Sequence, residues 1–210
     1  MEIRTHSLVA PLCAAIASLV IIGSSARAGY IVTLTQVGPN VVANGSGAID
    51  LGGLELLANS ISVPVEVNPI PAEIITGPPP SPNGLTIADL YVGAGFHGPT
   101  SIGNGFTEMF ATSGSGDVVG LIVDPPGGYG LFVPQGYISG TALLDTATYE
   151  NATFSNLGVT PGTYEWTWGA GANQNFTLKI GATTVPDAGS TFMLLSGAIV
   201  ALGSFKRRRI

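Results

Sequence analysis

Two uncharged apolar stretches, one near each end of the chain, most constrain how these 210 residues fold. The first follows a basic start, has its apolar centre at residues 8–22 and ends in Ala26-Arg27-Ala28. A basic start, an apolar run and an A-x-A end are typical of a secretory signal peptide. We therefore expect signal peptidase to remove residues 1–28 and to leave Gly29 as the new N-terminus. An uncleaved membrane anchor is the alternative.

The second stretch carries no charge over residues 188–205 and is followed directly by Lys206, Arg207, Arg208 and Arg209. At about 1.5 Å per residue, a helix of this length reaches about 27 Å, which is the lower limit for crossing a bilayer. Cations beside a membrane span stay on its cytoplasmic side. We expect a C-terminal transmembrane helix, with the body of the chain outside. The glycines of this stretch and the basic end argue against a buried core helix.

A short motif stands immediately before this span and reads Val185-Pro186-Asp187-Ala188-Gly189. The order of motif (185–191), apolar span (191–205) and basic cluster (206–209) resembles the sorting tails of the PEP-CTERM class, most closely the VPDSG-CTERM variant. Val185, Pro186, Asp187 and Gly189 match the variant, and Ala188 stands where it has Ser. The resemblance implies processing of the tail (185–210) by an exosortase-like membrane transpeptidase. A sortase signal would need an LPxTG motif, which the sequence lacks, and a GPI signal would end in its apolar tail.

The residues between the two ends are acidic. All but Glu2 and Asp187 of the thirteen acidic residues lie within residues 29–185, where Lys179 is the only base. Nucleic acid binding needs Lys and Arg side chains that neutralise phosphates, so this composition excludes nucleic acid as a partner. The only cysteine, Cys13, lies in the expected signal peptide. The mature chain is therefore predicted to have no disulfide, no thiolate nucleophile and no cysteine metal site.

Short segments rich in strand formers run through the body and are separated by turn residues. No window of the body shows the 3.6-residue apolar period of an amphipathic helix. We expect one all-β sandwich over residues 29–184, flanked by an N-terminal signal-peptide helix and the C-terminal transmembrane helix. The expected strands are 30–37, 41–50, 106–112, 117–123, 130–133, 137–144, 148–154, 163–168 and 175–180.

Two segments of the body are predicted to be a turn and an irregular stretch. Ser113-Gly114-Ser115-Gly116 predicts the turn of a hairpin that joins 106–112 to 117–123. Residues 64–82 hold seven prolines and predict irregular structure with at most an edge strand.

The body is also similar to a recurrent PEP-CTERM-type ectodomain. The segments that carry this likeness are 30–38, 45–51, 137–143 and 160–169. The resemblance implies export and sorting and does not imply a reaction.

Two patterns suggest an enzyme and are weak. Residues 93–98 fit G-x-G-x-x-G after a strand-like segment, but Pro99 follows where a dinucleotide site needs a helix. His97 is the only histidine left after signal cleavage, so a Ser-His-Asp triad would have to use it. No G-x-S-x-G nucleophile elbow accompanies it. A pair of carboxylates could also catalyse glycoside hydrolysis, but the acids of the body offer many pairs and none stands out.

Tyr164, Trp166 and Trp168 share one face of an expected strand, since side chains alternate along a strand. Such a row is more often the core face of a sandwich, and we predict that role here. The alternative is an exposed platform on which Trp166 and Trp168 stack against sugar rings.

No cofactor is predicted. Loop oxygens of Asp117, Asp124, Asn104 and Asn83 are candidates for weak surface Ca²⁺ binding, but the EF-hand pattern is absent and no site is assigned.

The sequence thus predicts an exported, non-enzymatic surface or extracellular-matrix protein with a C-terminal sorting signal. Its expected partners are signal peptidase, the inner membrane and an exosortase-like enzyme, with exopolysaccharide as a candidate. A carbohydrate-binding module and a secreted hydrolase are the alternatives.

Overall fold

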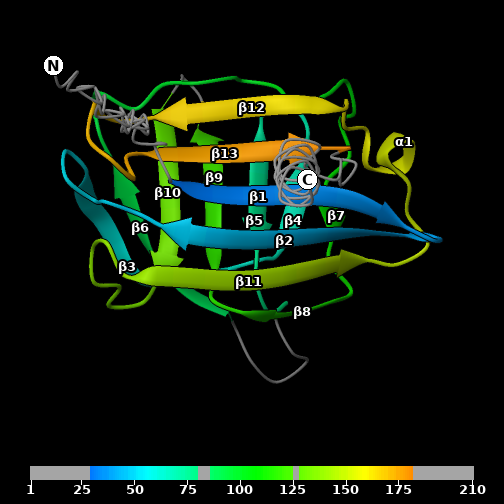
Figure 1. Cartoon of the computed structure of the whole chain (residues 1–210), viewed down its shortest axis with the longest axis horizontal. Coiled ribbons are helices and arrows are strands. Elements are labelled where there is room, and N and C mark those ends of the chain that lie inside the picture. The colour runs from blue at the N-terminus through cyan, green and yellow to red at the C-terminus, as the bar shows by residue number, and fades with distance from the viewer. Residues whose placement is uncertain (1–28, 80–85, 125–127, 182–210) are drawn as a thin grey trace, which may run out of the picture.

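The computed structural model describes residues 29–79, 86–124 and 128–181. These residues form two β-sheets packed face to face, which confirms the predicted sandwich (Figure 1). The expected signal-peptide helix and transmembrane helix lie outside the described residues. Within the described ranges, no helix has the length and apolar character needed to cross a membrane.

Sheet A has the strand order β12-β13-β1-β2-β11-β8, and sheet B has the order β3-β6-β10-β9-β5-β4-β7. The strands of sheet A are β1 (Tyr30–Val37), β2 (Asn40–Ala48), β8 (Ser113–Gly116), β11 (Ala142–Tyr149), β12 (Gly162–Thr167) and β13 (Asn175–Ile180). The strands of sheet B are β3 (Glu55–Val63), β4 (Glu66–Asn68), β5 (Glu73–Thr76), β6 (Thr86–Val92), β7 (Met109–Phe110), β9 (Val119–Asp124) and β10 (Gly128–Pro134).

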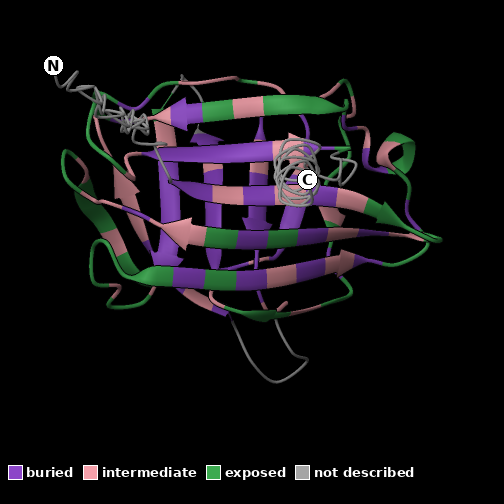
Figure 2. Cartoon of the chain, in the orientation of Figure 1, coloured by how far each residue is buried: buried purple, intermediate pink, exposed green. Residues whose placement is uncertain are grey.

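The two sheets cross. In Figure 1 the strands of sheet A run across the view, while those of sheet B run up and down behind them. The core fills the space between the sheets, where alternate side chains of each strand point inward. On β1 these are Tyr30, Val32 and Leu34, all fully buried. Figure 2 shows this alternation of buried and more exposed residues along sheet A.

Because β1 and β13 pair in parallel, the described chain begins its first strand at one end of sheet A and finishes its last strand at the other. Tyr30 lies opposite Phe176, and Leu34 lies opposite Ile180. Both strands therefore start at the same end of sheet A and run toward the other. The described chain enters at Gly29 at the first end, and β13 finishes at Ile180 at the opposite end.

The predicted hairpin over residues 106–123 is wrong. Residues 113–116 form β8, which pairs with β11 in sheet A, whereas β7 and β9 on either side belong to sheet B. Glycine and serine have little intrinsic strand preference, so β8 forms because its partner imposes the conformation. Gly114 fits closely there, since a Cβ would lie 2.1 Å from the Gly77 carbonyl oxygen.

The proline-rich stretch holds more regular structure than predicted. It contains β4 and β5, and β5 lies inside sheet B between β9 and β4. Pro64, Pro69 and Pro71 stand outside these two strands, so no ladder hydrogen bond is lost to them. The expectation of at most an edge strand is therefore wrong.

Two further differences concern the strands themselves. The sequence did not predict β3, whose residues are mostly exposed along a sheet edge. The strands predicted over 137–144 and 148–154 are one strand, β11, followed by a single-turn helix α1 (Phe154–Leu157). Thr153 caps this turn by accepting a hydrogen bond from the Asn156 amide, which accounts for its start.

Candidate functional site

Most of the predicted sorting residues lie outside the described residues. These are Ala26, Ala28, Val185, Pro186, Asp187, Ala188, Gly189, Lys206, Arg207, Arg208 and Arg209. Gly29, the predicted new N-terminus, is the first described residue and is buried. A Cβ at Gly29 would lie 2.0 Å from Oδ1 of Asn175, so the chain enters the sandwich in close contact with β13.

The two tryptophans belong to the core, as predicted. Trp166 has no exposed surface and Trp168 is 4% exposed. The indole Nε1 of Trp166 donates to the Pro99 carbonyl at 2.9 Å, and that of Trp168 donates to the Asp50 carbonyl at 2.7 Å. A sugar ring needs an open aromatic face, so stacking on Trp166 and Trp168 is ruled out by their burial.

The glycine-rich segment 93–98 is a loop that covers this core. A Cβ at Gly98 would lie 2.3 Å from Cδ1 of Trp166, which explains why a residue without a side chain stands there. His97 is exposed, its Nδ1 lies 2.7 Å from the Gly95 carbonyl oxygen, and its Nε2 lies 3.1 Å from Oγ1 of Thr167. The imidazole is thus held by a carbonyl and a hydroxyl, and no carboxylate among the described side chains orients it as a triad requires.

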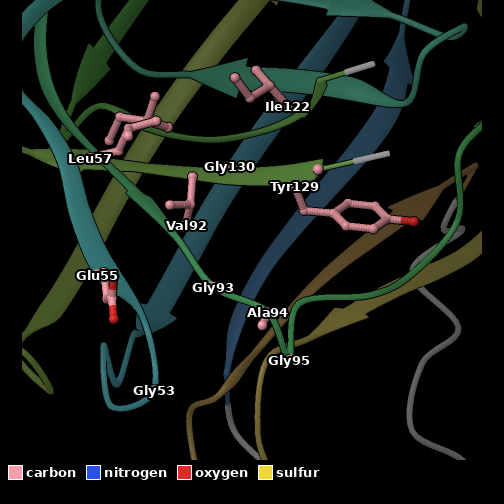
Figure 3. Close-up of a pocket in the computed structure, with 12 residues that line it drawn as sticks. Gly53, Glu55, Leu57, Val92, Gly93, Ala94, Gly95, Ile122, Tyr129 and Gly130 are labelled. Carbon is pink, nitrogen blue, oxygen red and sulfur yellow. The ribbon is translucent and has the colours of Figure 1, made fainter. Parts of the chain in front are cut away.

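The outer face of sheet B carries a pocket of about 510 Å³ (Figure 3). Gly130 on β10 lies at the base of the pocket and has no side chain to fill it. A Cβ there would lie 2.8 Å from Cδ1 of Leu90 and 2.9 Å from Cγ1 of Ile122. Glu55 is the one charged residue of the lining. The lining comprises Gly53, Glu55, Leu57, Leu90, Val92, Gly93, Ala94, Gly95, Ile122, Gly128, Tyr129 and Gly130.

Tyr129 packs into the core beneath this pocket. Its ring stacks on Phe96 with centroids 5.5 Å apart, and its hydroxyl donates to the Gly98 carbonyl at 2.6 Å. Figure 3 shows the ring directed away from Leu57 and Val92. The walls of the pocket are therefore mainly aliphatic side chains and glycine backbone.

Three carboxylates meet toward the edge of sheet B that is formed by β4 and β7. Glu66 lies on β4, Glu73 on β5 and Glu108 immediately before β7, and one oxygen from each lies within 4.8 Å of the other two. β4 pairs with both neighbours, placing Asn68 opposite Glu73 and Val67 opposite Met109. Because side chains alternate, this register places the three carboxylates on one face of the sheet.

Burial and mutual repulsion govern the protonation of this cluster. Burial, followed by the contact with Glu108 and the charge of Glu73, raises the pKa of Glu66 to about 8. Burial and the charge of Glu108 also raise the pKa of Glu73, against a lowering contribution from the Asn68 side chain. The cluster was not identified from the sequence, because only the pairing of β4 with β5 and β7 brings its members together.

Among the loop residues considered for Ca²⁺, Asp117 is not one of the carboxylates that meet in this cluster. Oδ2 of Asp117 accepts a hydrogen bond from the Leu144 amide at 2.8 Å. The Asn104 amide donates to the Gly158 carbonyl in another loop. Asn83 lies outside the described residues, and so does the side chain of Asp124.

Comparison with known proteins identifies the tail. Residues 184–209 match the family described as "VPDSG-CTERM motif". No curated protein and no solved structure is significantly similar to the chain. The matched range contains both the motif at 185–189 and the basic residues 206–209. The chain therefore carries at its C-terminus a VPDSG-CTERM motif, which marks a PEP-CTERM-type exosortase sorting signal and implies an exported, membrane-processed protein.

Proposed function

We propose that the processed protein is a non-enzymatic module of the cell surface or extracellular matrix. The sorting signal at 184–209 is the observation that carries this proposal. In it, residues 191–205 span the inner membrane until an exosortase-like enzyme acts near residues 185–189. Pro186 holds the motif extended, because its ring restricts φ. Residues 206–209 keep the end of the chain in the cytoplasm.

The direction of the chain supports display of the pocket away from the membrane. β13, the last strand before the tail, finishes at Ile180. The pocket residues Gly53 and Gly95 approach the Trp168 carbonyl oxygen, with hypothetical Cβ atoms 3.5 and 3.2 Å from it. Trp168 follows β12 at the end of sheet A where β13 begins. The end of β13, from which the tail continues, and the pocket glycines thus lie at opposite ends of sheet A.

A secreted hydrolase has less support than a binding or structural role. His97 contacts the Gly95 carbonyl and the Thr167 hydroxyl, so its ring is used to hold the loop to β12. The carboxylates of Glu66, Glu73 and Glu108 lie within 4.8 Å of one another. That arrangement is closer than the carboxyl separation of about 6.5–9.5 Å in inverting glycosidases and of about 5–5.5 Å in retaining ones.

The intact mass of the protein in each cell fraction of its native host tests the proposal. The expected product lacks residues 1–28 and 206–209 and is found on the surface or in the medium. Replacing Pro186 by Ala should leave more unprocessed chain in the inner membrane. Pro161→Ala, at an exposed proline of the ectodomain, is the matched control and should be processed normally. Wild-type protein that retains residues 206–209 in the inner membrane would show a plain anchor and contradict the proposal.

A glycan-binding module is the second candidate, and the pocket on sheet B is the observation that favours it. In this role, Glu55 and the backbone of the glycines that line the pocket hydrogen-bond sugar hydroxyls. The aliphatic side chains of the walls contact the C–H faces of the sugar rings. The test measures retention of the full chain on exopolysaccharide from its host. Leu57→Asp should abolish retention, and Ile138→Asp should not, because Ile138 is exposed and lies outside the pocket lining. Absence of retention of the wild-type chain contradicts this candidate.

A further inference from the structure

We propose that Glu66, Glu73 and Glu108, together with the side-chain oxygen of Asn68, form a Ca²⁺ site at the β4–β5–β7 side of sheet B. This site goes beyond the sorting signal and the surface role proposed above. It differs from the loop candidates considered from the sequence, because its ligands come from paired strands.

The distances between the carboxylates suit one shared ion. One oxygen from each of Glu66, Glu73 and Glu108 lies within 4.8 Å of the other two. Ca²⁺ binds oxygen ligands at about 2.3–2.6 Å, so two ligands on opposite sides of an ion are about 4.6–5.2 Å apart. The three carboxylates can therefore contact a common ion with little rearrangement.

A second observation points to a ligand in the cluster. The Glu66 side chain is only 2% exposed, and its Oε2 is buried without a hydrogen-bond partner. Oδ1 of Asn68, on the same face of β4, is also buried and without a partner. Buried polar oxygens are normally satisfied, since an unpartnered one costs free energy. A cation between them would satisfy both.

No positive side chain balances the cluster in the described part of the chain. The described residues form no salt bridge, and their one lysine, Lys179, lies on β13 in sheet A. Burial, and then the repulsion among the three clustered carboxylates, raise the pKa values of Glu66 and Glu73. A divalent cation removes this repulsion and favours the ionised carboxylates.

The donor set and the setting favour Ca²⁺ over softer metals. All the ligands are oxygens, which suit hard cations, and neither histidine nor cysteine takes part. Exported modules commonly bind Ca²⁺ with dissociation constants of about 10⁻⁴–10⁻³ M. Glu108 is exposed while Glu66 is buried, so the cluster opens to solvent on one side and an ion can enter.

The ion would stabilise a weak part of the sheet. β4 has three residues and β7 has two, so few ladder hydrogen bonds hold them. Figure 1 shows β4 between β5 and β7 in sheet B. An ion bound by Glu66, Glu73 and Glu108 joins β4, β5 and the segment before β7 at one point.

Calorimetric titration of the full chain with CaCl₂, in detergent after treatment with EDTA, tests the proposal. We expect one ion per chain, and a rise in the thermal midpoint of about 3–10 °C at about 10 mM CaCl₂. Glu73→Gln and Glu108→Gln should each weaken binding about tenfold or more, because affinity follows ligand charge. Glu66→Gln should remove binding while the chain stays folded, since Gln is a neutral isostere.

The matched control is Glu150→Gln, which neutralises an exposed carboxyl at the end of β11 and should bind Ca²⁺ like the wild type. Several results would overturn the site. These are no heat and no thermal shift with CaCl₂, equal binding in the cluster variants and Glu150→Gln, or tighter binding of Mg²⁺ or Mn²⁺ than of Ca²⁺. A wild type that does not respond to Ca²⁺, together with glutamine variants more stable than it, would show proton sharing among the carboxyls instead.

Discussion

The hydroxyl of Tyr30 on β1 donates a hydrogen bond to the carboxylate of Asp145 on β11, across the intervening strand β2. Both residues are buried between the sheets. Burial, and then the charge of Asp145, raise the pKa of Tyr30, so the phenol stays protonated and serves as donor. The bond links two strands that are not neighbours.

Glycine on β2 makes this contact feasible. A Cβ at Gly45 would lie 2.1 Å from the Tyr30 hydroxyl oxygen and 2.5 Å from Oδ1 of Asp145. Gly45 pairs with Asp145 on one side and on the other with Val32, two residues after Tyr30 on β1. The side chains of Tyr30 and Asp145 thus meet over a strand position that has no side chain of its own.

The pH dependence of stability should carry the signature of Asp145. Burial raises its pKa from the usual 3.8 to about 6, although the hydrogen bonds with Tyr30 and Thr76 act in the opposite direction. A carboxyl that holds its proton more tightly when folded stabilises the protein below pH 3.8 and loses this contribution as the pH rises to about 6. A shift of this size corresponds to about 3 kcal/mol in the free energy of unfolding.

Urea denaturation of wild type and Asp145→Asn at several pH values measures this effect. The wild-type free energy of unfolding should fall between pH 4 and 6, and Asp145→Asn should lack that part of the slope, because Asn does not titrate. Glu150→Gln, at an exposed carboxyl, should keep the slope. An unchanged slope in Asp145→Asn would show that other carboxyls cause it.

Gly45→Ala should destabilise the sandwich by about 1–3 kcal/mol, because the added methyl group overpacks the contact between Tyr30 and Asp145. The backbone at Gly45 does not require glycine, so crowding is the cause tested. Ser46→Ala, at the next residue on the exposed face of β2, serves as the control and should change stability little. Equal thermal midpoints for the two variants would contradict the crowding argument.

Trp166→Ala should lower the free energy of unfolding by about 3–5 kcal/mol, because it removes a fully buried ring and leaves a cavity. It also leaves the Pro99 carbonyl without its indole donor. Ile138→Ala should change stability by less than about 0.5 kcal/mol, since Ile138 is 72% exposed. Chemical denaturation of both variants provides the measurement, and similar midpoints would conflict with a core role for Trp166.

Strands with strong local signals were predictable from the sequence. β1, β12 and β13 follow in sequence the alternation of apolar and polar residues that predicts a strand. The role of Trp166 in the core followed from the same alternation. These features depend on residues close together in the chain, so local preference and packing agree.

Other elements could not be predicted because distant partners impose them. β8 consists of Ser-Gly-Ser-Gly and is a strand only because it pairs with β11. β11 continues through Asp145, which resembles a turn residue in sequence, because Tyr30 holds the carboxyl in the core. The pocket likewise depends on Gly130 lying between Leu90 and Ile122 from two neighbouring strands.

The sequence by itself determined the sorting signal at 184–209, because its elements are a contiguous motif, span and basic cluster. It also determined the all-β class and the acidic charge of the body, which are sums over local patterns and composition. Only the tertiary structure decided which acids meet. Glu66, Glu73 and Glu108 form a cluster because β4 pairs with both β5 and β7. A shift of one residue in that register would turn side chains of the cluster to the opposite face of the sheet, so their proximity is a property of strand pairing.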